Sequence, residues 1–108
     1  MKNARIHQRF VTSDYILDET ATLLRAHSHP QLAGDFLLNI KASMSCRIVW
    51  MDVELFNNTT RFFIQHGDQD WSFTDCVSFV VMRQMKLHTA LIKDHRFRAA
   101  GFDTPLLR

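Results

Sequence analysis

Short β-branched runs and longer stretches with helical spacing follow one another along the chain. Residues 11–13 form a brief β-branched run, which predicts a short strand. Residues 14–27 then carry apolar side chains at helical intervals, so we expect a helix with one buried face, capped by Ser13 or Asp14. A further helix is predicted to begin at Pro30, because proline is favoured in the first turn of a helix.

The same alternation continues in the second half of the chain. Residues 47–51 mix β-branched and aromatic side chains and give the clearest strand prediction, and a helix is expected over about residues 52–65. The next predicted helix is capped by Ser72 or Thr74 and ends near Met85. Its apolar residues are so many that we expect it to be buried on more than one side.

The two ends of the chain carry shorter predicted elements. Residues 1–10 have the pattern of the end of a helix, residues 89–92 that of a short strand, and residues 95–100 that of a short helix stopped by Gly101. Alternation of helices and strands is typical of a three-layer α/β domain with a mainly parallel sheet. Because the sequence has no repeat and no low-complexity linker, residues 1–108 are expected to form a single domain.

The composition is that of a soluble globular protein. Hydrophobic residues make up 46% of the 108 positions and charged residues 22%, which excludes a disordered or collagen-like chain. The apolar runs are shorter than the roughly 18 residues of a membrane span, so no membrane partner is expected. Cys46 and Cys76 do not form a C-x-x-C pair and no secretory signal opens the sequence, so we predict a cytoplasmic location.

The charge balance is mildly basic. A net charge of +2 does not by itself indicate a nucleic-acid-binding protein. The basic residues are scattered, apart from a loose C-terminal group of Lys93, Arg96, Arg98 and Arg108. This group is either a solvated rim or a lip that holds a phosphate backbone, and the sequence leaves both interpretations open.

Three acidic residues occupy positions at which α/β proteins bind ligands. Glu19 lies early in the helix after the first predicted strand, Asp75 in the first turn of the apolar helix, and Asp94 directly after the strand predicted at residues 89–92. Ligand sites of parallel sheets lie beyond the carboxyl ends of the strands, so we expect these carboxylates to meet in one crevice. Packed carboxylates need a cation, and an oxygen donor set selects Mg²⁺ or Mn²⁺ over zinc.

Each acid also has a purely structural interpretation. Glu19 could be an exposed residue of a helix surface, Asp75 an acid favoured by the helix dipole, and Asp94 the start of a turn. A zinc site at His27 and His29 is less favoured, because a third ligand is not near them in the sequence. If the three carboxylates do converge on a divalent ion, phosphodiester hydrolysis is the reaction that such a site would catalyse.

Three blocks of sequence, residues 11–25, 70–79 and 90–102, resemble in order the acidic segments of the PIN-domain family of VapC-type toxins. The resemblance implies the PIN-like α/β/α fold, with Glu19, Asp75 and Asp94 as metal-binding and catalytic residues. It also implies Mg²⁺-dependent endoribonuclease cleavage of an RNA substrate, a cognate antitoxin protein as partner, and a homodimer.

The sequence departs from the family pattern in two places. The first, central strand of PIN domains, which ends in a metal-binding Asp, has no counterpart here, so the domain is expected to be incomplete at the N-terminus. A misassigned start, gene decay and a strand supplied by a second chain are three explanations. In addition, Arg96 stands where the family usually has His before Phe97, and His95 is displaced by one position. Two functions therefore stay open: a PIN-type toxin ribonuclease, or a catalytically dead PIN remnant that serves only as a protein-binding or dimerisation module.

Overall fold

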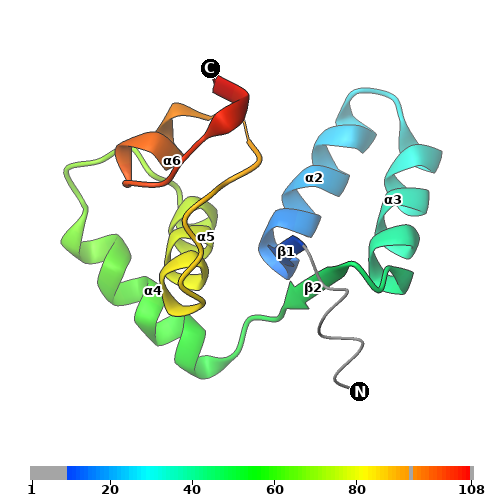
Figure 1. Ribbon diagram of the computed structural model, residues 1–108. Coiled ribbons are helices and arrows are strands. Elements are labelled where there is room, and N and C mark those ends of the chain that lie inside the picture. Colours follow the sequence, from blue (N-terminus) through cyan, green and yellow to red (C-terminus); the bar gives the residue numbers. More distant parts are fainter. Residues whose placement is uncertain (1–9, 93, 108) are drawn as a thin grey trace. The chain divides into compact units, whose positions relative to one another are not determined.

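The computed structural model describes residues 10–92 and 94–107. They form two compact units, one reaching Met51 and the other beginning at Asp52, and each unit is described by itself (Figure 1). The helix end predicted within residues 1–9 lies outside the described residues, and Phe10 belongs to a strand.

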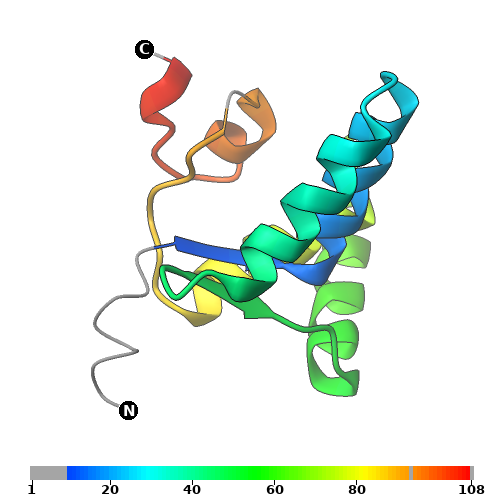
Figure 2. The same cartoon turned by 90° about the vertical axis from the view of Figure 1, so that its right-hand side faces the viewer.

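The first unit contains two parallel strands and two helices. In chain order these elements are β1 (Phe10–Ser13), α2 (Asp14–Ala26), α3 (Pro30–Ala42) and β2 (Cys46–Val49). The strands pair in parallel, with Phe10 opposite Cys46 and Ser13 opposite Val49. Figures 1 and 2 both show α2 and α3 side by side, with the strands at the end of the helix pair where α2 begins and α3 ends.

Strand β1 passes into helix α2 without a loop. The Ser13 hydroxyl accepts a hydrogen bond from the Ile16 N–H at 3.3 Å, so the last strand residue is also the helix N-cap. The Asp14 carboxylate accepts a hydrogen bond from the Met51 N–H at 3.1 Å, and it thereby ties the start of α2 to the chain just after β2. This junction confirms the predicted strand–helix order and gives Glu19 a fixed place on α2.

The second unit is built around one aromatic side chain. Its elements are α4 (Val53–Gln65), α5 (Phe73–Gln84), α6 (His95–Ala99) and the 3-10 turn η1 (Pro105–Leu107). Phe79 of α5 is 0% exposed. Four aromatic rings surround it at centroid distances of 4.8 to 6.2 Å, and they belong to Phe62, Trp71, Phe97 and Phe102. This core joins α4, α5 and α6 and so positions the helix starts that carry Asp75 and Asp94.

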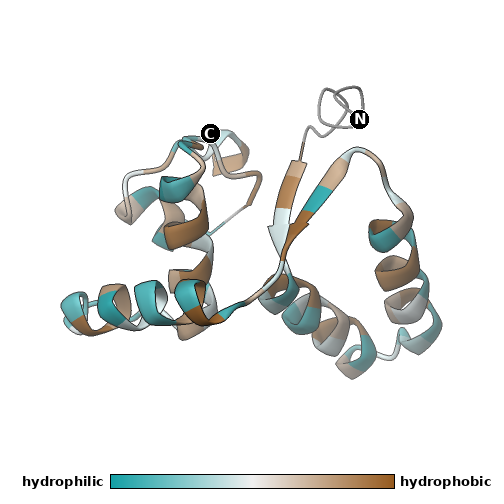
Figure 3. Ribbon diagram, turned by 90° about the horizontal axis from the view of Figure 1, so that it is seen from below, coloured by the Kyte–Doolittle hydropathy of each residue, from teal (hydrophilic) through white to brown (hydrophobic). Residues whose placement is uncertain are grey.

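The helices follow the predicted amphipathic pattern. In Figure 3 each long helix carries both hydrophobic and hydrophilic residues. Helix α5 is buried on more than one side, as expected; its buried residues are Cys76, Val77, Phe79, Val80, Val81 and Met82. Among the described helices, none is long and apolar enough to cross a bilayer.

The strand predicted over residues 89–92 is wrong. Within the described residues, this segment makes only an isolated parallel bridge between Thr89 and Asp103. The Ala90 N–H donates to the Asp103 carbonyl at 2.8 Å, and the Asp103 N–H donates to the His88 carbonyl at 2.7 Å. The segment therefore pairs with the C-terminal part of its own unit through two bonds, too few for a ladder, and Leu91 is exposed.

The predicted fold class is confirmed. The described chain is a mixed α/β structure, and its sheet consists of β1 and β2 in parallel. The expectation that residues 1–108 form a single domain stays a prediction.

Candidate active site

Asp75 is held in place by the start of helix α5. The Ser72 hydroxyl accepts a hydrogen bond from the Asp75 N–H at 3.0 Å, and the Asp75 Oδ2 accepts one from the Ser72 N–H at 3.0 Å. The two residues thus form a capping box, and the structure selects Ser72 over Thr74 as the cap. The Asp75 side chain is only 14% exposed. Its carboxylate has a structural role at the helix end, and the same hydrogen bonds fix its orientation.

Asp94 has the same relation to helix α6. It is the N-cap residue, and its Oδ1 accepts a hydrogen bond from the Arg96 N–H at 2.9 Å. Its Oδ2 lies 3.3 Å from Nη1 of the Arg96 side chain. Buried Phe97 anchors this short helix in the aromatic core. Both predicted acids of the second unit are therefore set at helix starts that one core holds together.

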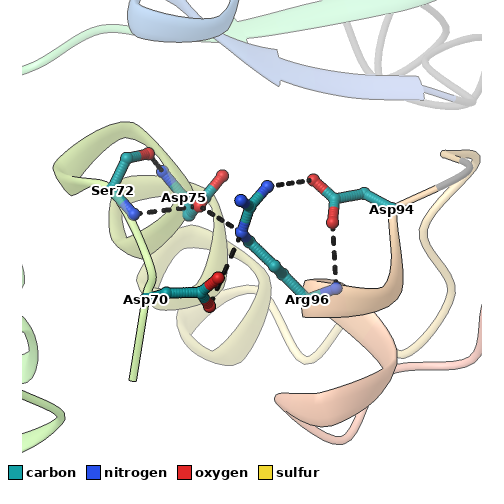
Figure 4. A network of polar contacts seen from close by, with 5 residues as sticks. All are labelled: Asp70, Ser72, Asp75, Asp94 and Arg96. Carbon is teal, nitrogen blue, oxygen red and sulfur yellow. Dashed lines mark hydrogen bonds and ion pairs between the residues drawn. The ribbon is translucent and has the colours of Figure 1, made fainter. Parts of the chain in front are cut away.

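The Arg96 guanidinium lies between these acids (Figure 4). Its Nε is 3.9 Å from Asp75 Oδ2 and 3.7 Å from Oδ1 of Asp70. The charges of Asp94, Asp70 and Asp75, in that order, raise the pKa of Arg96 above its ordinary value. The structure therefore brings Asp75 and Asp94 together around a shared cation.

Asp70 is an acid of this group that the sequence did not single out. It belongs to a turn cluster that ends just before the Ser72 cap, and its side chain is largely exposed. The signal that could have found it is its closeness to a helix start already carrying a predicted site residue. We call Asp70, Asp75, Asp94 and Arg96 the acid–arginine cluster.

A shallow cleft, open to solvent, lies on one side of the acid–arginine cluster. It has a volume of about 440 Å³, and its lining residues are Gln69, Asp70, Trp71, Asp94, His95, Arg96 and Ala99. The Arg96 side chain is 45% exposed, so solutes reach the cluster from the cleft. The buried ring of Trp71 stacks in the core beside Phe62.

The third predicted site residue, Glu19, lies in the other unit. It is an exposed residue of α2, and its convergence with Asp75 and Asp94 stays a prediction. Among the described residues, no group of three or more His, Cys, Asp or Glu side chains is arranged to hold a metal ion. The carboxylates of Asp75 and Asp94 are nevertheless of the donor type that Mg²⁺ and Mn²⁺ prefer, and both already face a cation. The carboxylate oxygens of Asp75 and Asp94 are therefore suitable ligands for a divalent ion.

Comparison with known proteins decides the family. No family model matches the chain. The 23S rRNA-specific endonuclease VapC20 of Mycobacterium tuberculosis is 32% identical over 92 residues, in strain CDC 1551 / Oshkosh and in strain ATCC 25618 / H37Rv alike. The match covers 85% of this chain and 70% of the relative. The chain belongs to the VapC-type PIN-domain toxin family.

A solved structure supports the same assignment for the fold. The crystal structure of Mycobacterium tuberculosis VapC20, described as a sarcin–ricin loop cleaving toxin, matches with a TM-score of 0.78 at 32% identity. The match covers 85% of this chain and 70% of that chain. The resemblance inferred from the three sequence blocks is thus confirmed. In this VapC-type chain, the residue that departs from the family motif, Arg96, is also the one that contacts the predicted acids.

Proposed function

We propose that this VapC-type chain is a metal-dependent endoribonuclease toxin that cleaves RNA phosphodiester bonds. In this proposal Asp75, Asp94 and Glu19 bind Mg²⁺ or Mn²⁺ and are the catalytic residues. The observation that supports it most is the arrangement of Asp75 and Asp94, two acids from separate helix starts whose carboxylates face the same cation, Arg96. Asp94 and Arg96 also line the cleft.

The proposed cleavage reaction depends on a divalent ion held by the fixed carboxylates of Asp75 and Asp94. A bound divalent ion would lower the pKa of a water molecule and neutralise charge on the scissile phosphate. The capping box fixes the orientation of the Asp75 carboxylate at the start of α5, and the N-cap bond does the same for Asp94 at α6. These acids therefore require little reorganisation to bind an ion, which favours catalysis because the orientation is already fixed in the folded chain.

The proposed substrate is taken from the relative, and the proposed partners are those that the family implies. VapC20 is a 23S rRNA-specific endonuclease and a sarcin–ricin loop cleaving toxin. We therefore include the sarcin–ricin loop of 23S rRNA in the proposal as the first substrate to test. A cognate antitoxin protein, a homodimeric assembly and a cytoplasmic location belong to the same proposal, because they are implied by the toxin family.

The test is cleavage of a sarcin–ricin loop RNA and of total ribosomal RNA by the purified chain, with Mg²⁺ and with EDTA. Asp75→Asn and Asp94→Asn should each lower the rate at least about a hundredfold, because a metal ligand contributes several kcal/mol in the transition state. Asparagine can still accept the capping hydrogen bonds, so both variants should keep their helix starts. Asp35→Asn, at an exposed acid of α3, is the control and should cleave like the wild type.

Two results would contradict the proposal. Cleavage unaffected by both substitutions would remove Asp75 and Asp94 from the reaction. A folded chain that binds Mg²⁺ but does not cut any of these RNAs would instead favour the catalytically dead PIN remnant.

A further inference from the structure

Arg96 lies between Asp75 and Asp94, the two acids that are proposed to bind a metal ion. Its guanidinium contacts Asp94 Oδ2 at 3.3 Å, Asp70 Oδ1 at 3.7 Å and Asp75 Oδ2 at 3.9 Å. A guanidinium is planar and carries its positive charge at any physiological pH. The three carboxylates are thus partly neutralised by a residue of the chain itself.

The contacts that hold Arg96 are of unequal strength. Only the contact with Asp94 is a hydrogen bond, whereas the separations from Asp70 and Asp75 are those of ion pairs without one. The Arg96 side chain is 45% exposed, so water and salt screen these attractions. By contrast, the hydrogen bonds that fix Asp75 and Asp94 to their helix starts do not involve the guanidinium. Arg96 can therefore leave while the acids remain in place.

The charges of the cluster favour an exchange of cations. Three carboxylates against one guanidinium leave two negative charges uncompensated, and these attract a divalent cation to the cleft. Arg96 nevertheless lies beside the same oxygen atoms that such an ion would need. An incoming divalent ion is therefore attracted by the carboxylates and repelled by the guanidinium of Arg96.

We propose that Arg96 is a built-in counter-ion, which partly neutralises the acids of the cluster in the metal-free protein and competes with a divalent ion for Asp75 and Asp94. This inference rests on the proposed function, because it assumes that these two acids bind the ion. It deepens that function by making metal loading an exchange in which the guanidinium is displaced from the carboxylates. The same residue sets how much metal the toxin needs before it is loaded.

The test is calorimetric titration of the full chain with MnCl₂. Arg96→Gln keeps a polar side chain and removes the charge, and it should bind Mn²⁺ about tenfold more tightly than the wild type, because a unit positive charge no longer lies beside the divalent ion. Arg96→Lys retains the charge without the planar fork and should bind with an affinity between those two. The matched control is Arg98→Gln on the same helix, where Arg98 Nε donates to Thr104 Oγ1 at 3.2 Å, and its affinity should equal that of the wild type.

A second readout is thermal unfolding in EDTA and in MnCl₂. In EDTA, Arg96→Gln should unfold at a lower temperature than the wild type, because the carboxylates repel one another without their counter-ion. Adding Mn²⁺ should raise its unfolding temperature by more than that of the wild type. Far-UV circular dichroism identifies a variant that fails to fold, in which case Arg96→Lys provides the comparison.

The outcomes separate the inference from the proposed function. If wild type and Arg96→Gln bind Mn²⁺ equally, or the variant binds more weakly, Arg96 does not compete and the inference is overturned while the proposed function stands. If neither protein binds Mn²⁺, both are overturned.

Discussion

The carboxylate of Asp75 and the guanidinium of Arg96 lie 3.9 Å apart, on two helices that meet in the aromatic core around Phe79. Asp75 precedes Phe79 by one helical turn on α5, and Phe97, the neighbour of Arg96, packs its ring against Phe79 at 4.8 Å. The edge-to-face packing of these rings therefore helps to set the distance between the acid and the arginine. The charged cluster at the cleft depends on an apolar contact beneath it.

Replacing Phe79 should consequently disrupt both stability and the cluster. Phe79→Ala removes a fully buried ring that contacts four others, and it should lower the free energy of unfolding by about 3–5 kcal/mol. Urea denaturation followed by circular dichroism measures the loss. Ile64→Ala is the control, because Ile64 is 70% exposed on α4 and its truncation should cost no more than about 0.5 kcal/mol. A comparable loss in both variants would contradict the central role of Phe79.

The capping box at Ser72 should contribute to stability and to the site together. Ser72→Ala removes the hydroxyl that accepts the Asp75 N–H, and it should lower the free energy of unfolding by about 1 kcal/mol. Ser72→Thr keeps the hydroxyl and should lie within a few tenths of a kcal/mol of the wild type. Urea denaturation compares the three proteins, and a Ser72→Ala variant as stable as the wild type would show that the cap is not needed.

Thr59 should be a site at which the protein can be stabilised. Its side chain on α4 is 0% exposed, and its hydroxyl has no hydrogen-bond partner among the described residues. A buried hydroxyl without a partner costs about 1–3 kcal/mol, so Thr59→Val should raise the free energy of unfolding by about 1 kcal/mol. Thr59→Ser keeps the hydroxyl, loses a methyl group and should lower it. Chemical denaturation of both variants checks these opposite signs, and destabilisation by valine would indicate that the hydroxyl is satisfied.

Cys76 should be the less reactive of the two thiols. It is 1% exposed, and burial, followed by the negative charge of Asp75, raises its pKa above 9.0. Burial alone raises the pKa of Cys46, which is only half-buried. Because the thiolate is the reactive form, iodoacetamide at pH 8 should label Cys46 well before Cys76 in the folded protein, as measured by peptide mass spectrometry.

The same shift has a consequence for stability at alkaline pH. The folded chain holds the Cys76 proton more tightly than the unfolded chain, whose thiol has a pKa near 9.0. The stabilisation is therefore fully present below that pH and is lost as the pH rises through the folded-state pKa. Replacing Cys76 by alanine should flatten the decline of unfolding free energy above about pH 9. Labelling of Cys76 as fast as Cys46 would contradict both expectations.

The elements that local patterns determine were predictable. The sequence predicts the strand that ends at Ser13, the helix that Ser13 caps and the long apolar helix, and all three form. They are predictable because side-chain periodicity and capping residues act within a few positions. The strand expected at residues 89–92 was not formed, because a strand needs a partner, and this segment has only one bridge to Asp103. Strand pairing is a long-range property that a β-branched run alone does not fix.

The candidate site was predictable in part. Asp75 was singled out at a predicted helix start, and Asp94 after the strand predicted at residues 89–92, which does not form. The structure brings both acids to Arg96, and their role in metal binding stays a prediction. Asp70 and Arg96 could not be assigned to the cluster in the same way. Their contact arises from the packing of α5 and α6 on Phe79, which sequence spacing does not reveal. From the sequence, Arg96 was visible as a departure from the family motif and as a member of the C-terminal basic group.

The proposed site depends on binding of a divalent ion by Asp75 and Asp94. Calorimetric titration with MnCl₂ of the wild type and of the double variant Asp75→Asn/Asp94→Asn measures this binding, with Asp35→Asn as the control. We expect saturable binding to the wild type and to the control, and an affinity at least about a hundredfold weaker for the double variant, because both charged oxygen ligands are lost. Equal affinity of the double variant and the wild type would contradict it.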